Sequence, residues 1–191
     1  MNQIYIIEHL EPEIWPWCLI EYKSISKIVG KENLWFTNIK PSNESKELSK
    51  YGKVIPESVK SLNLQDACVL DPEAPALLSP KECKDFKYFI FGGILGNYPA
   101  KKRTKVELTR FLTNVKARNI GKGQFTTDNA VFVVSQIASG KAIQEMKFQD
   151  NPKIELNKVE SITLHYCYPL INGKPRINKG IIEYIKNKKE F

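Results

Sequence analysis

The chain has 191 residues, of which 42% are hydrophobic and 10% aromatic, and its formal net charge is +8. This composition is ordinary for one globular domain that is long enough to bury a core, and it excludes a charged, disordered chain. The charge is uneven, because residues 1–95 carry 11 basic and 13 acidic side chains (−2) whereas residues 96–191 carry 18 and 8 (+10). A basic second half favours an anionic partner such as RNA or a ribosomal surface, although a solvated lysine-rich face explains the same excess.

The sequence also disfavours a membrane protein, a disulfide-rich protein and a metal-binding protein. The first apolar run, residues 4–7, is short and leads directly into Glu8 and His9, so neither a targeting leader nor a membrane span is expected. The four cysteines are far apart without a C-x-x-C pair, and the chain has two histidines. We therefore expect reduced, buried thiols, no metal site and a cytoplasmic protein.

The pattern of apolar runs and helix signals alternates between strands and helices. In chain order it predicts a strand at 4–7, a helix from Pro16 to Gly30, a strand at 34–39, a polar helix-and-loop region at 42–62, a strand at 67–70, a helix after Ser79, a strand at 86–91, a helix at 104–112, a short strand at 117–120, a helix at 130–138, a strand at 160–168 and a helical, lysine-rich tail from Gly180. This alternation predicts an α/β fold with a mostly parallel sheet and helices on both faces, as a single domain over residues 1–191.

The stretch FIFGGILGN, residues 89–97, is the most unusual in the chain. A strand-type aromatic run ends at Gly92 and Gly93, and Gly96 follows two apolar residues later. Three glycines in five positions at the end of a buried strand indicate positive φ angles or the close approach of another group. A tight packed turn and a ligand-binding loop both satisfy this pattern. Neither G-x-G-x-x-G nor a P-loop is present, so the stretch does not indicate dinucleotide or nucleoside triphosphate binding.

Two glycine-bearing loops each lead into a predicted helix start. Thr104 and Glu107 have the T-x-x-E spacing of a capping box, and Thr126, Thr127 or Asp128 can cap the later helix. Amides at a helix N-terminus can bind an anionic group of a ligand. Capping alone explains Thr104, Glu107 and Thr127 without any ligand, and the spacing by itself favours capping.

Five motifs carry a resemblance to a known family. They are IIEHLEP (6–12), LIEY (19–22), LDPEA (70–74), FIFGGILGNYPAKKRTKVEL (89–108) and GQFTTDNAV (123–131). Together they closely resemble one subgroup of the SPOUT-class S-adenosylmethionine-dependent methyltransferases, over residues 4 to about 180. That subgroup carries a generic RNA-methyltransferase label and includes protein arginine methyltransferases that act on a ribosomal protein. The resemblance implies a sheet whose C-terminal part is threaded into a trefoil knot, which is an exception to the usual absence of knots.

The resemblance also implies a cofactor site for S-adenosylmethionine, with S-adenosylhomocysteine as the product. Its three loops correspond to the neighbourhood of Asp71 and Pro72, to residues 92–97 and to residues 120–128. Leu95 and Phe125 would offer apolar surface to adenine, and Arg103 would bind the cofactor carboxylate or the substrate unless it is a solvated cation. The full set of implied cofactor contacts is Asp71, Gly92, Gly93, Ile94, Leu95, Gly96, Asn97, Arg103, Thr104, Glu107, Phe125, Thr126, Thr127 and Ala130.

Transfer from an activated sulfonium depends mainly on holding the acceptor in line with the methyl group. An arginine acceptor also needs a carboxylate that pairs with its guanidinium and takes a proton. Glu8, Glu21 and Asp128 are the candidates, although a lysine partner would explain Glu21 and helix capping would explain Asp128. His9 fits the E-H pair of the family, and a hydrogen-bonding role explains it equally well.

Three functions remain open at this point. The first is methylation of an arginine in a ribosomal or translation-associated protein. The second is methylation of rRNA or tRNA, which the basic second half favours. The third is an RNA- or ribosome-binding domain of the same fold without turnover. Residues 97–102 depart from the family pattern, so the choice of acceptor stays open, as does the choice between monomer and homodimer.

Overall fold

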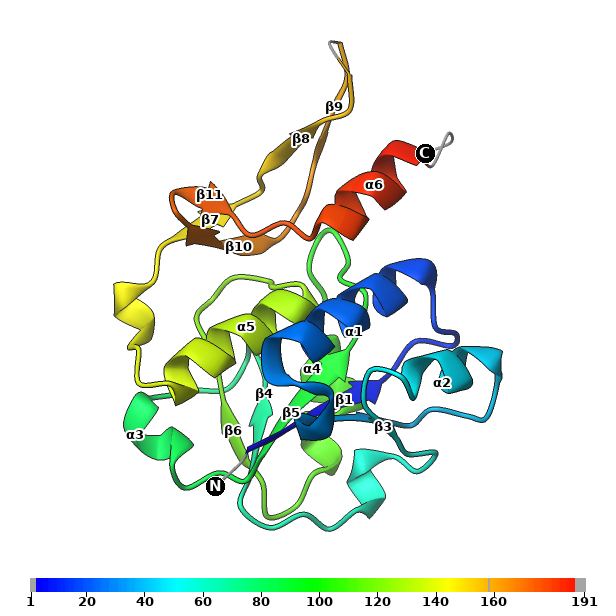
Figure 1. Cartoon of the computed structure of the whole chain (residues 1–191). Coiled ribbons are helices and arrows are strands. Elements are labelled where there is room, and N and C mark those ends of the chain that lie inside the picture. The colour runs from blue at the N-terminus through cyan, green and yellow to red at the C-terminus, as the bar shows by residue number, and fades with distance from the viewer. Residues whose placement is uncertain (1–2, 158, 188–191) are drawn as a thin grey trace.

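The computed structural model describes residues 3–157 and 159–187. Its main sheet has six strands in the order β3-β2-β1-β5-β4-β6, and every neighbouring pair is parallel (Figure 1). The strands are β1 (Ile4–His9), β2 (Leu34–Thr37), β3 (Lys53–Val54), β4 (Ala67–Leu70), β5 (Tyr88–Gly93) and β6 (Lys116–Arg118). The predicted α/β class with a mostly parallel sheet is confirmed. The two-residue strand β3 has no signal in the sequence, and the trefoil knot stays a prediction.

One face of the sheet is covered by α1 (Pro16–Val29) and α5 (Thr127–Ala138), which lie side by side in front of it in Figure 1. Helix α1 begins with Pro16, whose fixed φ suits a first helical turn. Gly30 follows its last residue and caps the helix with a φ of 81°. The short helices α2 (Asn43–Leu48) and α3 (Pro80–Cys83) add Leu48 and Cys83 to the same core. Because parallel strands are buried on this face, their side chains there are apolar.

The second face is covered more thinly than the prediction of helices on both faces implies. Ile6, Val69 and Ile90 point to this face and form a smaller core with Val59 and Leu108. Val59 lies in a 3-10 turn, and Leu108 follows the five-residue helix α4 (Arg103–Glu107). Turns and one short helix therefore take the place of long helices on this side.

The prediction of a single strand at 160–168 is wrong, because two separate strands share this segment. The chain turns at Tyr166, whose amide donates to the Leu164 carbonyl, and the strands on either side join different small antiparallel sheets. The first sheet pairs β8 (Lys153–Glu155) with β9 (Ser161–Thr163), which Figure 1 shows projecting away from the main sheet. The second places β10 (Cys167–Ile171) between β7 (Phe148–Asp150) and β11 (Lys174–Pro175).

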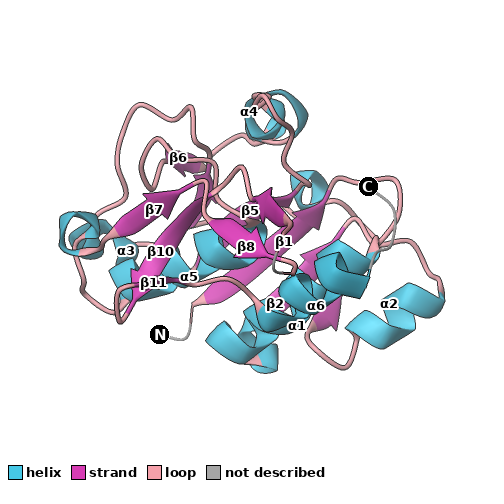
Figure 2. Cartoon of the chain, turned by 90° about the horizontal axis from the view of Figure 1, so that it is seen from above, coloured by secondary structure: helices cyan, strands magenta, loops and turns pink. Residues whose placement is uncertain are grey.

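Helix α6 (Lys179–Asn187) ties this C-terminal part to the main body, and Figure 2 shows it beside α1. Its buried Ile181 and Ile185 belong to a core that also receives Trp17 and Ile20 of α1. The helical tail predicted from Gly180 is thus confirmed as far as Asn187, and its last four residues lie outside the described residues.

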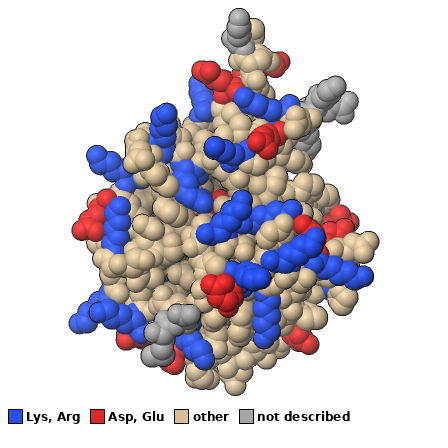
Figure 3. All heavy atoms as spheres, viewed as in Figure 1, with Lys and Arg blue, Asp and Glu red and all other residues tan. Residues whose placement is uncertain are grey.

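All four cysteines are buried and unpaired, as the sequence predicts. Across residues 3–157 and 159–187, no helix is long and apolar enough to cross a membrane, and no three His, Cys, Asp or Glu side chains gather as metal ligands. Figure 3 shows lysine and arginine side chains at several separate places on the α1–α5 face, with acidic ones among them and uncharged surface between. On this face, therefore, the basic excess does not gather in one compact C-terminal patch.

Candidate functional site

A cavity lies at the carboxyl ends of β4, β5 and β6, the edge where ligands bind in open α/β sheets. Residues 70–72, 91–104 and 120–130 supply its walls, and we call it the three-loop cavity. These are the three loops that the sequence analysis names. Of the predicted cofactor contacts, the cavity is lined by Asp71, Gly92, Ile94, Leu95, Gly96, Asn97, Arg103, Thr104, Phe125, Thr127 and Ala130. Gln124 and Lys101 also line it and are not among the predicted residues.

Three residues predicted to contact the cofactor, Gly93, Glu107 and Thr126, do not line the three-loop cavity. The alternation of side chains along β5 turns Gly93 toward α1, where an added Cβ would lie 2.4 Å from the Tyr22 hydroxyl. The Glu107 carboxylate accepts two hydrogen bonds from Arg103, so the predicted capping box with Thr104 does not form, and α4 begins one residue earlier. The Thr126 hydroxyl donates to Asp128 instead of touching the cavity.

Gly93 is therefore expected to matter for stability. We predict that Gly93→Ala lowers the free energy of unfolding by about 1–3 kcal/mol, the usual cost of overpacking. The new Cβ would also lie 3.1 Å from the Glu8 carbonyl oxygen, which is backbone and cannot turn away. Gly92→Ala is the matched control, because its Cβ would meet mainly the flexible end of Ile94. Urea unfolding of both variants checks this, and equal midpoints would contradict it.

Arg103 closes one wall of the three-loop cavity and is not a solvated cation. Its Nη1 donates to Glu11 Oε1 over 2.7 Å, and its Nε donates to Glu107 Oε1 over 2.7 Å. Donation to the Glu107 carboxylate, and to a smaller extent to that of Glu11, raises the pKa of the Arg103 guanidinium, which stays charged. Glu11 Oε1 also accepts from the Leu95 amide over 2.9 Å, so one carboxylate links two residues of the wall.

A second hollow, the acidic cleft, lies at the carboxyl ends of β1 and β2. Glu11 lines it, so this side chain stands between the cleft and the three-loop cavity. The Asn38 backbone has a φ of 60°. Its side-chain amide donates to the His9 carbonyl over 2.6 Å and holds the two strand ends together. The lining residues are His9, Glu11, Pro12, Glu13, Ile14, Asn38, Ile39, Lys40, Ser42 and Glu44. Glu11 is paired with Arg103, so Glu13 and Glu44 against Lys40 still leave this hollow with an excess of negative charge that attracts a cation.

His9 is the last residue of β1 and is named as a candidate from the sequence. Glu11, two residues further on, is not. His9 is 5% exposed, and its ring Nδ1 lies 2.8 Å from the Tyr22 hydroxyl. Burial lowers the pKa of His9, which keeps the ring neutral near pH 7. Its Nε2 is buried and finds no hydrogen-bond partner within residues 3–157 and 159–187.

Glu8, the first predicted base, lies away from both hollows. Its carboxylate is fully buried at the end of β1 and accepts from the Thr37 hydroxyl over 2.6 Å and the Val59 amide over 2.9 Å. The Ser58 hydroxyl donates to its other oxygen. These contacts tie the 58–59 turn to the sheet, so the geometry favours an anchoring role, and a catalytic role stays a prediction.

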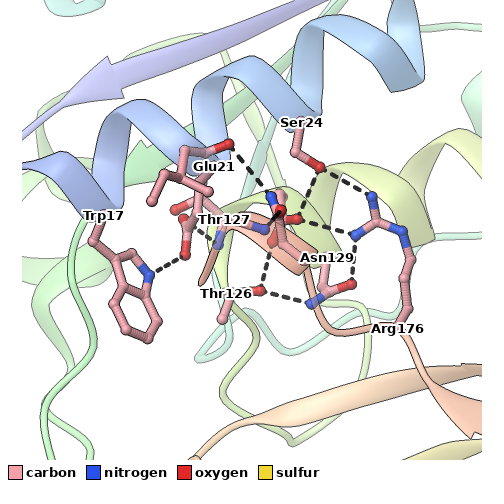
Figure 4. Close-up of polar contacts among 11 residues, drawn as sticks. Trp17, Glu21, Ser24, Thr126, Thr127, Asn129 and Arg176 are labelled. Atoms are coloured by element: carbon pink, nitrogen blue, oxygen red, sulfur yellow. Dashed lines mark hydrogen bonds and ion pairs between the residues drawn. The ribbon is translucent and has the colours of Figure 1, made fainter. Parts of the chain in front are cut away.

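Glu21, the second predicted base, is buried between α1 and α5 (Figure 4). It accepts from the Trp17 indole over 2.7 Å and from the Thr127 amide over 3.1 Å. Thr126 occupies the N-cap position of α5, but its side chain makes no cap bond, and Glu21 of the neighbouring helix supplies an acceptor instead. Burial and the charge of Asp128 raise the pKa of Glu21 to about 8. The lysine partner that the sequence leaves open is not what Glu21 contacts here.

Asp128, the third predicted base, lies in the same buried network. Its Oδ1 accepts from Thr126 over 2.8 Å, and its Oδ2 accepts from Ser24 over 3.0 Å. Arg176 completes the set with a 3.1 Å ion pair to Oδ2. Neither Glu21 nor Asp128 lines either hollow, whereas Thr127 beside them lines the three-loop cavity. Catalysis by these two carboxylates stays a prediction, and their geometry favours holding the start of α5.

The raised pKa of Glu21 predicts a pH-dependent stability. Its value is about 8 in the folded protein against an ordinary 4.5, so the folded state keeps a proton that the unfolded chain has released. This contribution is fully present below pH 4.5 and is lost as the pH rises to about 8. Glu21→Gln is expected to flatten that decline in urea unfolding measured from pH 5 to pH 9. Parallel profiles for the variant and the unaltered protein would contradict the assignment.

The chain matches one family of known proteins over nearly its whole length. The family model described as "SFM1-like: Protein arginine N-methyltransferase SFM1-like" matches residues 4–190. Protein arginine N-methyltransferase SFM1 of Saccharomyces cerevisiae is 36% identical over 199 residues, which cover 95% of this chain and 93% of that protein. The chain spans nearly the whole of this relative.

Solved structures agree with that match. The yeast arginine methyltransferase SFM1 complexed with SAM has a TM-score of 0.89 at 33% identity, covering 97% of this chain and 91% of that one. The complex with SAH has a TM-score of 0.88 at 33% identity, with 95% and 94% covered. A dual specific Trm10 from Thermococcus kodakaraensis has a TM-score of 0.59 at 18% identity, covering 75% and 96%, which shows a likeness of fold alone.

Proposed function

This chain belongs to the SFM1-like protein arginine N-methyltransferase family, and from that premise we propose that it methylates an arginine side chain of a ribosomal or other translation-associated protein. S-adenosylmethionine is the methyl donor and binds in the three-loop cavity. The observation that carries the proposal is the contact of this cavity with the acidic cleft through Glu11.

The three-loop cavity suits an adenosine-containing ligand. Leu95 and Phe125 offer apolar surface for a purine ring, and Asn97, Thr104 and Gln124 offer polar groups at its edge. Gly96 permits a close approach of the chain, since a Cβ there would lie 2.6 Å from both the Gln124 amide and the Tyr166 ring. When bound, S-adenosylmethionine supplies a methyl group already activated on a sulfonium, so the protein has mainly to place the acceptor.

The acidic cleft suits a guanidinium better than a phosphate. Glu11 and Glu13 line it, and carboxylates pair with the planar donors of arginine through charge-assisted hydrogen bonds. Formation of the new N–C bond leaves a surplus proton on the guanidinium nitrogen, and a carboxylate of the cleft accepts that proton and passes it to water. A phosphate backbone would instead meet Glu13 and Glu44 in addition to the paired Glu11, which disfavours RNA as the acceptor at this place.

The remaining surface gives a reason for a partner rich in RNA. Lysine and arginine side chains stand at several places on the face shown in Figure 3, and such charges attract a phosphate surface without needing a specific site. A ribosomal protein presents an arginine next to such a surface. The buried, unpaired thiols suit a reducing cytoplasm.

The first test is titration calorimetry with S-adenosylmethionine and S-adenosylhomocysteine, in which we expect saturable one-to-one binding. The second is transfer from methyl-labelled donor to ribosomal subunits and extract proteins. Label that survives ribonuclease, disappears with protease and yields methylarginine on hydrolysis would support the proposal. Label lost with ribonuclease would overturn it in favour of RNA methylation. Donor binding without any labelled product would favour a domain that has lost turnover.

A further inference from the structure

We propose that Arg176 is a positioning residue for the three-loop cavity. It holds the first turn of α5 in place through Asp128 and Asn129, so that Thr127 and Ala130 keep their places in the cavity wall. The inference rests on the proposed function, because it concerns the affinity of the same cavity for S-adenosylmethionine.

The contacts of Arg176 bring together three parts of the chain (Figure 4). Arg176 lies between β11 and α6, and its side chain is 18% exposed. Nη1 donates to Asn129 Oδ1 over 2.8 Å and to Asp128 Oδ2 over 3.1 Å, while Nη2 donates to Ser24 Oγ over 3.2 Å. A guanidinium holds its donors in a fixed planar fork, so it can serve acceptors on α1 and α5 in one defined geometry, whereas an ammonium group is a point charge on a flexible stem.

The network continues to the start of α5 as a closed ring. The Asn129 amide donates to the Thr126 hydroxyl over 2.7 Å, and that hydroxyl donates to Asp128 Oδ1 over 2.8 Å. Arg176 closes the ring by binding both Asp128 and Asn129. Thr126 lies directly between Phe125 and Thr127, which both line the three-loop cavity. A shift of this turn therefore moves the cavity wall on both sides of Thr126.

Charge makes the role of Arg176 stronger than that of a neutral hydrogen-bond donor. Glu21 and Asp128 are 4% and 2% exposed, and the charge of Asp128 disfavours the ionised form of Glu21. Among residues 3–157 and 159–187, Arg176 supplies the ion pair to Asp128. Without it, the buried charge of Asp128 would stand beside Glu21 with no cation to offset it, and a buried unpaired charge is unfavourable.

The test uses the full chain with Arg176→Gln, Asp128→Asn and the double variant, each checked by circular dichroism for a folded state. We expect Arg176→Gln to raise the Kd for S-adenosylhomocysteine about tenfold, and the KM for S-adenosylmethionine in parallel, with the KM for the protein substrate unchanged. Adding Asp128→Asn is expected to restore the Kd to within about threefold, because it removes the uncompensated charge. A role in overall stability alone would leave the Kd of the folded protein unmoved.

Arg118→Gln is the matched control. Arg118 is also 18% exposed and pairs with a carboxylate, Glu82, but it lines neither hollow, so its Kd should match that of the unaltered protein. If Arg176→Gln does not fold, Arg176→Lys decides, because it keeps the charge and loses the fork, and we expect a Kd raised about threefold.

Normal affinity in whichever Arg176 variant folds would overturn the inference, as would a double variant that binds no better than Arg176→Gln. If the unaltered protein binds neither S-adenosylmethionine nor S-adenosylhomocysteine, the proposed function itself is contradicted, and the inference falls with it.

Discussion

Glu11→Gln is expected to raise the KM for the protein substrate by about 10- to 100-fold, since a hydrogen bond to a charged group contributes about 1.5–3 kcal/mol. The variant removes the charge that faces the acidic cleft and keeps a carbonyl oxygen for the Leu95 amide and Arg103. The three-loop cavity should therefore keep its shape. Steady-state kinetics with both substrates varied, together with calorimetry on S-adenosylmethionine, measures the two effects separately.

Glu82→Gln provides the control for Glu11→Gln. Glu82 pairs with Arg118 much as Glu11 pairs with Arg103, but it lines neither hollow, so kinetics should change by less than about twofold. A normal KM for the protein substrate in Glu11→Gln would show that the arginine does not bind in the acidic cleft. Loss of cofactor binding alone would show that Glu11 acts through the wall of the three-loop cavity.

Glu8→Ala is expected to lower the free energy of unfolding by about 3 kcal/mol or more. The substitution leaves the Thr37 hydroxyl, the Ser58 hydroxyl and the Val59 amide without their acceptor, and each unsatisfied buried donor costs about 1–3 kcal/mol. Chemical denaturation followed by fluorescence measures this loss.

Glu8→Gln separates anchoring from catalysis. A glutamine oxygen can still accept from Thr37 and Val59, and its amide can donate to the Ser58 hydroxyl, so the turn at 58–59 should stay attached. We expect a turnover number within about threefold of the unaltered protein. A fall of 100-fold or more in a folded variant would support Glu8 as the base and place the acceptor elsewhere than in the acidic cleft.

The local pattern of the chain was enough to predict the α/β class, whereas the three loops of the cavity were predicted from the family resemblance. An apolar run followed by Gly92, Gly93 and Gly96 marks a strand end and a close-packed loop in any context, because these preferences belong to the residues themselves. The carboxyl ends of parallel strands meet at one edge, so predicting the strands also predicted which loops come together. The family motifs then assigned those loops to a cofactor.

A local sequence pattern can fit more than one arrangement in the folded protein, and the pattern alone then does not identify the one that forms. The spacing of Thr104 and Glu107 is that of a capping box, yet Glu107 binds Arg103, which presents a charged donor one turn away on the same helix. Gly93 resembles its neighbour Gly92 in sequence, but the alternation of the strand turns it toward Tyr22 and away from the cavity.

Tertiary structure alone decided which carboxylates line a hollow and which are enclosed by hydrogen-bond donors of the fold. Glu8 and Glu11 are three residues apart, and the first is enclosed by the 58–59 turn while the second lies between two hollows. Arg176 reaches Asp128 across 48 positions and Ser24 across 152, so no window of sequence contains the network that surrounds Glu21. The composition shows how many charges the chain carries, but pairing, burial and access depend on distances in space, and those arise only when the chain has folded.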